Sequence, residues 1–112
     1  MGAQGTTTIN LGAFPGSSDG TAVITGQAGI VAGSLVEAWV YPVATSDHSA
    51  DEHWVENLKA SAGAIVAGTG FTIYLRDDNR LYEPPPDNNR GGYPAQSQPR
   101  VYGSWTVAWV WN

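Results

Sequence analysis

The strongest structural signal in the chain is Val101-Tyr102-Gly103-Ser104-Trp105-Thr106-Val107-Ala108-Trp109-Val110-Trp111. Its odd positions include Trp105, Trp109 and Trp111, whereas its even positions hold small or mixed residues. In an extended chain, successive side chains point to opposite faces, so the three tryptophans share one face. Aromatic and β-branched residues favour strands. This stretch therefore predicts a strand with one strongly aromatic face.

Other segments alternate in the same way. A second strand is predicted over Ser34 to Val43, where Val36, Ala38 and Val40 form an apolar face that should meet the core. Phe71, Ile73 and Leu75 are likewise expected to point inward. Residues 6–14, 21–25 and 54–60 are shorter strand candidates. Short strands punctuated by glycines predict one all-β domain over residues 1–112, a small antiparallel β-sandwich or jelly roll.

The aromatic face has two interpretations. Trp39, on the predicted strand 34–43, is a candidate to lie beside Trp105, Trp109 and Trp111. Exposed, such a row would stack on sugar rings; buried, it would be a core or a subunit interface. Three exposed tryptophans in a row would form an apolar patch of a kind that soluble monomers avoid. A core or an interface is therefore favoured, and a sugar platform stays open.

Charge is scarce and unevenly divided. Only 13% of the residues are charged, against about 25% in an ordinary soluble domain. Residues 1–75 hold one lysine and six acids, while residues 76–112 hold four arginines and four acids, so the net charge of −5 belongs to the first part. A chain with a negative net charge is not expected to bind nucleic acid, because the phosphate backbone is also negative. No run approaches the roughly 18 apolar residues that would span a bilayer. Neither nucleic acid nor a membrane is therefore an expected partner.

The segment from about residue 76 to 100 is a long Pro/Gly-rich loop in the prediction. A loop of this length in a small domain usually serves a function, and its three consecutive prolines favour an extended, semi-rigid path. Arginine and tyrosine are residues that interfaces favour. We therefore expect a partner-binding arm formed by Arg76, Arg80, Tyr82, Pro84, Pro85, Pro86, Arg90, Tyr93 and Arg100.

Acid–base and metal-ligating side chains concentrate in one place, Asp47, His48, Asp51, Glu52 and His53. The two histidines are five residues apart, which puts them on different faces of a helix rather than together. Ser49 and Glu52 have the spacing of a helix capping box, which explains them without a metal. The chain has no cysteine and no Gly-x-Ser-x-Gly motif. We therefore expect no catalytic residue, no metal, no cofactor and no enzymatic activity.

Three segments carry a family resemblance: Ala44-Thr45-Ser46-Asp47-His48-Ser49-Ala50-Asp51-Glu52-His53, Gly68-Thr69-Gly70-Phe71-Thr72-Ile73-Tyr74 and Gly103-Ser104-Trp105-Thr106-Val107-Ala108-Trp109-Val110-Trp111-Asn112. Along most of its length the chain resembles small β-rich structural proteins of tailed-bacteriophage virions. Capsid decoration or cement proteins are the most similar in size and character.

The resemblance implies a viral protein on the capsid exterior, made in the cytoplasm of the bacterial host. Its expected partners are the major capsid protein, whose lattice it would bind and stabilise, and copies of itself in a homodimer or homotrimer. Two alternatives remain: a glycan-binding β-sandwich module of a phage tail, and a head–tail or tail completion component.

Overall fold

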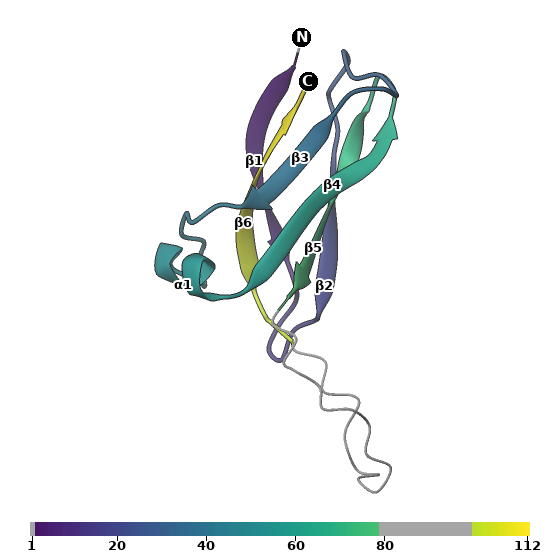
Figure 1. Ribbon diagram of the computed structural model, residues 1–112. Coiled ribbons are helices and arrows are strands. Elements are labelled where there is room, and N and C mark those ends of the chain that lie inside the picture. The colour runs from purple at the N-terminus through teal and green to yellow at the C-terminus, as the bar shows by residue number, and fades with distance from the viewer. Residues whose placement is uncertain (1, 79–99) are drawn as a thin grey trace, which may run out of the picture.

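The computed structural model describes residues 2–78 and 100–112 (Figure 1). In chain order its elements are β1 (Ala3–Asn10), β2 (Asp19–Ile24), β3 (Val36–Val40), α1 (Ala50–Val55), β4 (Leu58–Val66), β5 (Gly70–Asp77) and β6 (Ser104–Trp111). The described residues are mostly strands in two antiparallel sheets with almost no helix, which confirms the all-β prediction. Within these residues, no helix is long and apolar enough to cross a membrane. Most of the predicted loop 76–100 lies outside the described residues.

Each sheet has three strands. The first sheet has the order β1-β6-β3 and the second the order β2-β5-β4, with every neighbouring pair antiparallel. The two central strands, β6 and β5, are those whose sequences alternate most clearly. β3 of the first sheet and β4 of the second lie side by side (Figure 1). The remaining edge strands are β1 and β2.

The core lies between the two sheets. Its buried side chains include Trp105, Val107, Trp109 and Trp111 from β6, and Phe71, Ile73 and Leu75 from β5. The rings of Phe71 and Trp109 meet edge to face across the sheets, with centroids 5.5 Å apart and planes at 72°, an arrangement that aromatic pairs prefer. Val36, Ala38 and Val40 of β3 also pack on this core. The predicted inward faces of β3 and β5 are thus confirmed.

Gly5 allows the ring of Trp109 to lie close against β1. Gly5 and Trp109 are opposite each other in the β1–β6 ladder. A Cβ atom at position 5 would lie 2.6 Å from Cζ2 of the Trp109 ring. A glycine in a strand often marks such a close approach. The indole therefore occupies the space that a side chain at position 5 would take.

The predicted strand 54–60 is wrong at its start, because α1 continues through Trp54 and β4 begins only at Leu58. The predicted capping box is confirmed. Ser49 N–H donates to the Glu52 carboxylate at 2.7 Å, and Glu52 N–H donates to Ser49 Oγ at 3.2 Å. These reciprocal bonds satisfy backbone donors that a first helical turn leaves without partners. The helix includes Trp54 and Val55, two residues that the alternating pattern assigned to a strand.

Candidate functional site

The three C-terminal tryptophans belong to the core of the described structure. Trp105, Trp109 and Trp111 are 2%, 8% and 6% exposed. The Nε1–H of Trp105 donates to the Tyr102 carbonyl oxygen at 3.1 Å, and that of Trp111 to the Gln27 side chain at 2.8 Å. A buried indole presents no ring face to a sugar. These three residues therefore hold the two sheets together.

Trp39 does not lie with them. Residues opposite each other in neighbouring strands share a face, and it is Ala38 that stands opposite Trp109, whereas Trp39 stands opposite Ala108. Trp39 consequently points to the outer side of the first sheet and is 43% exposed. The expected grouping of Trp39 with the other three tryptophans is corrected by this one-residue difference in register.

We call the outer surface of the first sheet the Trp39 face, formed by Gln4, Thr6, Thr8, Glu37, Trp39, Tyr41, Ala108 and Val110. Among these residues Glu37 alone is charged. Thr6, Ala108 and Trp39 stand in one cross-strand row, with the small alanine in the middle. The face is therefore uncharged over most of its area and hollow along its centre.

A groove of about 280 Å³ follows that hollow, lined by Gln4, Gly5, Thr6, Trp39, Tyr41, Ala108 and Trp109. Trp39 in β3 and Tyr41 just after it, both partly exposed, supply aromatic rings. Gln4 and Thr6 supply hydrogen-bonding groups from β1. The groove can accept a flat apolar group or a ring that also forms hydrogen bonds.

The outer surface of the second sheet has a different character. Asp19, Arg76 and Lys59 form one cross-strand row, so three charged residues stand in line across it. Thr21, Tyr74 and Ser61 form the next row. This surface also holds a wide groove, lined partly by Asp19, Lys59 and Arg76. The outer surface of the second sheet thus carries more charged residues than the Trp39 face.

Two residues of the predicted arm lie in the described structure. Arg76 was expected in the loop, but it lies in β5, which runs to Asp77 because the alternation that begins at Phe71 continues through it. Its guanidinium lies 3.4 Å from the Asp78 carboxylate. Arg100 is exposed at the start of the second described range. The other predicted arm residues lie outside the described residues: Arg80, Tyr82, Pro84, Pro85, Pro86, Arg90 and Tyr93.

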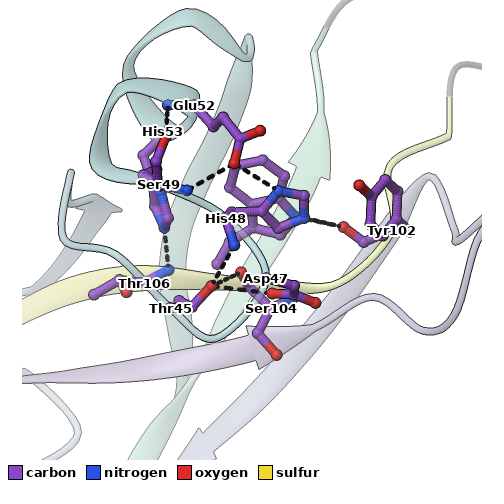
Figure 2. Close-up of polar contacts among 10 residues, drawn as sticks. Thr45, Asp47, His48, Ser49, Glu52, His53, Tyr102, Ser104 and Thr106 are labelled. Atoms are coloured by element: carbon purple, nitrogen blue, oxygen red, sulfur yellow. Dashed lines mark hydrogen bonds and ion pairs between the residues drawn. The ribbon is translucent and has the colours of Figure 1, made fainter.

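The histidine cluster lies where α1 meets β6 (Figure 2). The ring of His48 stacks on Trp105, with centroids 3.9 Å apart and planes at 17°. Its Nε2 lies 2.7 Å from the carbonyl oxygen of Tyr102, and its Nδ1 lies 3.2 Å from the Glu52 carboxylate. His48 thus joins the helix, the strand and the core in one contact.

His53 bonds to the backbone on both sides of its ring (Figure 2). Thr106 N–H donates to Nε2 at 3.0 Å, and Nδ1 lies 2.7 Å from the Ser49 carbonyl oxygen. Since Nε2 accepts and the carbonyl can only accept, the ring carries its hydrogen on Nδ1. Neither nitrogen of this 3%-exposed ring is left for another ligand.

Two of the three carboxylates of the cluster, those of Asp47 and Glu52, are held by backbone N–H groups. The Ser104 N–H, 3.2 and 3.3 Å from the two oxygens of Asp47, lowers the pKa of Asp47. The Ser49 N–H lowers the pKa of Glu52, and the nearby His48 adds to this effect. Gly103, at a φ of 87°, leaves room for this arrangement, because a Cβ there would overlap Asp47 and His48. Hydrogen bonds to the charged form account for both lowered pKa values.

The cluster that drew attention in the sequence therefore bonds mainly to the backbone and the core. Within residues 2–78 and 100–112, no three histidine or acidic side chains are placed to hold a metal ion. The arrangement secures a six-residue helix against the end of β6. Apart from the exposed Asp51, the side chains of the cluster bond to backbone groups of the chain or to one another.

Comparison of the chain with protein-family models, with curated proteins and with solved structures finds no match. Two surface features of the described residues then carry the functional argument. One is the Trp39 face with its groove, and the other is the outer edge of β1. Gln4, Thr6 and Ala108 become neighbours of Trp39 only when β6 is inserted between β1 and β3, so the sequence pattern does not place them beside it.

Proposed function

We propose that this protein is a non-enzymatic structural protein of a tailed-phage virion, a capsid decoration or cement protein that stabilises the lattice of the major capsid protein. The observation that carries the proposal is the Trp39 face, a sheet surface with two partly exposed aromatic rings and one charged residue. Its partners are the major capsid protein and copies of itself, in a homodimer or homotrimer. It acts on the capsid exterior after synthesis in the host cytoplasm.

The finer fold assignment in this proposal is a small β-sandwich. Two three-stranded sheets enclose one core, in the orders β1-β6-β3 and β2-β5-β4. A jelly roll has eight strands in two Greek keys. The strand orders favour the sandwich, whose outer surfaces are both available for contacts.

The composition of the Trp39 face supports binding to another protein. Interface centres are enriched in tryptophan and tyrosine and depleted in charge. Apart from Glu37, the neighbours of Trp39 and Tyr41 on this face are small or neutral, whereas the second sheet presents Asp19, Lys59 and Arg76. The Trp39 face is therefore the proposed lattice-binding surface, and the charged surface is the proposed solvent-facing one.

The hydrogen bonds that the titratable side chains make within the chain support a structural role. His48, His53, Asp47 and Glu52 each bond to the chain's own backbone or to one another. A lattice-binding protein needs shape and complementary surface rather than a reactive group. Weak single contacts suffice, because repetition over many lattice positions multiplies them through avidity. The predicted arm, from about residue 76 to 100, is the second proposed contact; Arg76 itself lies in β5 on the charged surface, and Arg100 at the other end is exposed.

The proposal is tested by co-sedimentation with capsids. The variant Trp39→Ala/Tyr41→Ala should bind capsids at least about tenfold more weakly, because it removes the two aromatic anchors. Tyr74→Ala is the matched control, since Tyr74 is 46% exposed on the other sheet and Tyr41 is 42% exposed on the Trp39 face. Equal capsid binding by the two variants would refute the assignment of the Trp39 face. Finding the protein at a few copies at one vertex would favour a head–tail component instead.

The groove favours a second candidate, a glycan-binding module. Aromatic rings beside hydrogen-bonding groups suit a sugar, which has both apolar C–H faces and hydroxyls. In that case an oligosaccharide would change the tryptophan fluorescence, and Trp39→Ala would abolish the change. A flat titration of the wild-type protein argues against this candidate.

A further inference from the structure

Among residues 2–78 and 100–112, each sheet has two edge strands, β1 and β3 in the first and β2 and β4 in the second. An edge strand presents unpaired backbone N–H and C=O groups that can pair with another chain. Folded proteins protect such edges with charged residues, prolines, bulges, short strands or a covering element. The four edges of this molecule can therefore be compared for these protections.

Three of the four edges are protected. β2 has six residues and begins with Asp19. β3 has five residues, contains Glu37 and lies beside β4. β4 contains Lys59 and a break in register between Gly63 and Val66. Each of these strands would meet a charge or an irregularity on pairing with a second chain.

Within the described residues β1 carries no charge, proline or bulge, although it contacts β2 of the second sheet. Its eight residues, Ala3–Asn10, include no charged residue and no proline. It pairs with β6 in one unbroken register, from Ala3 opposite Trp111 to Asn10 opposite Ser104. Thr6, Thr7, Thr8 and Ile9 give it a β-branched centre, which favours an extended chain. β1 is therefore a regular edge that is ready for pairing.

The backbone groups that face outward on β1 can be identified. Leu11 N–H donates to Gly103 O at 2.8 Å, in the same register as β1 and β6. Bonded and non-bonded pairs alternate along an antiparallel ladder. The odd residues of β1 therefore bond to β6, and Gln4, Thr6 and Thr8 direct their N–H and C=O groups away from it. Within the described ranges 2–78 and 100–112, these outward groups bond to no residue.

We propose that β1 pairs antiparallel with β1 of a second copy of this chain, which joins the two first sheets into one six-stranded sheet. The two-fold axis passes beside Thr6, so that Thr6 faces Thr6 and each Gln4 faces a Thr8. Such an interface is isologous, the commonest arrangement in homodimers. This inference rests on the self-association that belongs to the proposed function, and it names the strand responsible.

The absence of charge on β1 and β6 favours this edge as the place where two copies of the chain meet. The chain carries a net charge of −5, so most approaches of one copy to another bring like charges together. β1 has no charge, and the strand next to it, β6, has none either. Threonine pairs across a two-strand ladder are favourable. The outer edge of β1 is thus where two copies meet with the least repulsion.

The pairing has a consequence for the Trp39 face. Strands related by a two-fold axis perpendicular to their sheet present the same face on the same side. The two Trp39 faces would then form one continuous surface, and the dimer would bind a flat lattice through two equivalent patches.

The test uses two proline variants and sedimentation equilibrium. Thr6→Pro removes one outward N–H without removing a bond to β6, and proline is tolerated at such edge positions. Thr21→Pro is the matched control on β2: Asp77 N–H donates to Ser18 O in the β2–β5 register, so the N–H of Thr21 also points outward. We expect the wild-type protein and Thr21→Pro to be dimers, and Thr6→Pro to be a folded monomer by circular dichroism.

Two other results would overturn the proposal. A folded Thr6→Pro dimer would show that another surface is responsible, while self-association itself would stand. A monomeric wild-type protein would remove both the edge pairing and the self-association, while capsid co-sedimentation tests lattice binding separately.

A charge variant covers the case in which Thr6→Pro fails to fold. Thr6→Lys keeps the N–H but puts like charges opposite each other across the axis, which disfavours pairing. It should raise the dimer dissociation constant by at least about tenfold relative to Thr21→Lys. Equal dissociation constants for these two variants would refute the pairing.

Discussion

The inner and outer faces of the first sheet use tryptophan in opposite ways. On the inner face, Trp105, Trp109 and Trp111 are almost fully buried, whereas Trp39 on the outer face is nearly half exposed. Both faces belong to the same pair of strands, and they differ by a single position, since Ala38 rather than Trp39 stands opposite Trp109. The register therefore decides whether an aromatic ring stabilises the fold or remains free to bind.

The largest expected effect comes from truncating the inner face. Trp105→Ala removes a 2%-exposed ring that stacks on His48 and should lower the free energy of unfolding by about 3–5 kcal/mol. Trp39→Ala on the outer face should change it by less than about 1 kcal/mol. Urea denaturation followed by circular dichroism measures both. Equal losses from the two variants would contradict the contrast between the faces.

The next effect concerns the end of the outer face that α1 covers. By alternation along β6, Thr106 belongs to the outer face of the first sheet. It is nevertheless buried, because His53 lies over its N–H. His53→Ala leaves that buried donor and the Ser49 carbonyl oxygen without the histidine, which should cost about 3 kcal/mol. Asp51→Ala, an exposed change on the same helix, should cost less than about 1 kcal/mol. If both variants unfold at the same urea concentration, His53 does not anchor the helix.

A smaller effect tests how closely the inner face packs on β1. Gly5→Ala places a methyl group 2.6 Å from the buried ring of Trp109 and should cost about 2 kcal/mol through overpacking. Gly63→Ala, in β4, meets no atom within 4 Å and should change stability by less than about 1 kcal/mol. Thermal unfolding compares the two variants. A neutral Gly5→Ala would mean that Trp109 does not lie against β1.

The smallest expected effect is the loss of folding stability at acid pH through Asp47 and Glu52, which lie where α1 meets β6. The pKa values of Asp47 and Glu52 are lowered in the folded protein from ordinary values of 3.8 and 4.5. A lowered folded pKa stabilises the fold above the unfolded value, and that stability is lost as the pH falls through the folded value. Stability should therefore decline below about pH 4.5, and Glu52→Gln should reduce the slope. Unfolding midpoints measured from pH 6 to pH 3 would show an unchanged slope if Glu52 plays no such part.

Much of the fold follows from short-range patterns. The alternation in residues 71–75 and 101–111 predicts the two central strands, and Ser49 with Glu52 predicts the capped turn. Even the outward position of Trp39 follows from the sequence, since Val36, Ala38 and Val40 were expected to face the core and Trp39 has the other parity. Because Trp39 alternates with those residues, it points away from the core and does not share a face with the C-terminal tryptophans.

The candidate site depends on information that no local pattern contains. Gln4 and Thr6 become neighbours of Trp39 only because β6, the last strand, lies between the first and third. His53 meets Thr106 across more than fifty residues of sequence. Only the tertiary arrangement brings the two residues together, so that His53 accepts a hydrogen bond from the backbone N–H of Thr106.

The hydrogen bond from Thr106 N–H to His53 makes it possible to distinguish detachment of α1 from separation of the strands. The backbone N–H groups of Trp105 and Val107 point toward β1, whereas that of Thr106 is sealed by a side chain of α1. Exchange of the Thr106 amide hydrogen with solvent therefore requires only that α1 swing away, while exchange at its two neighbours requires the strands to separate. One residue within the central strand of the first sheet thus records how often the helix detaches.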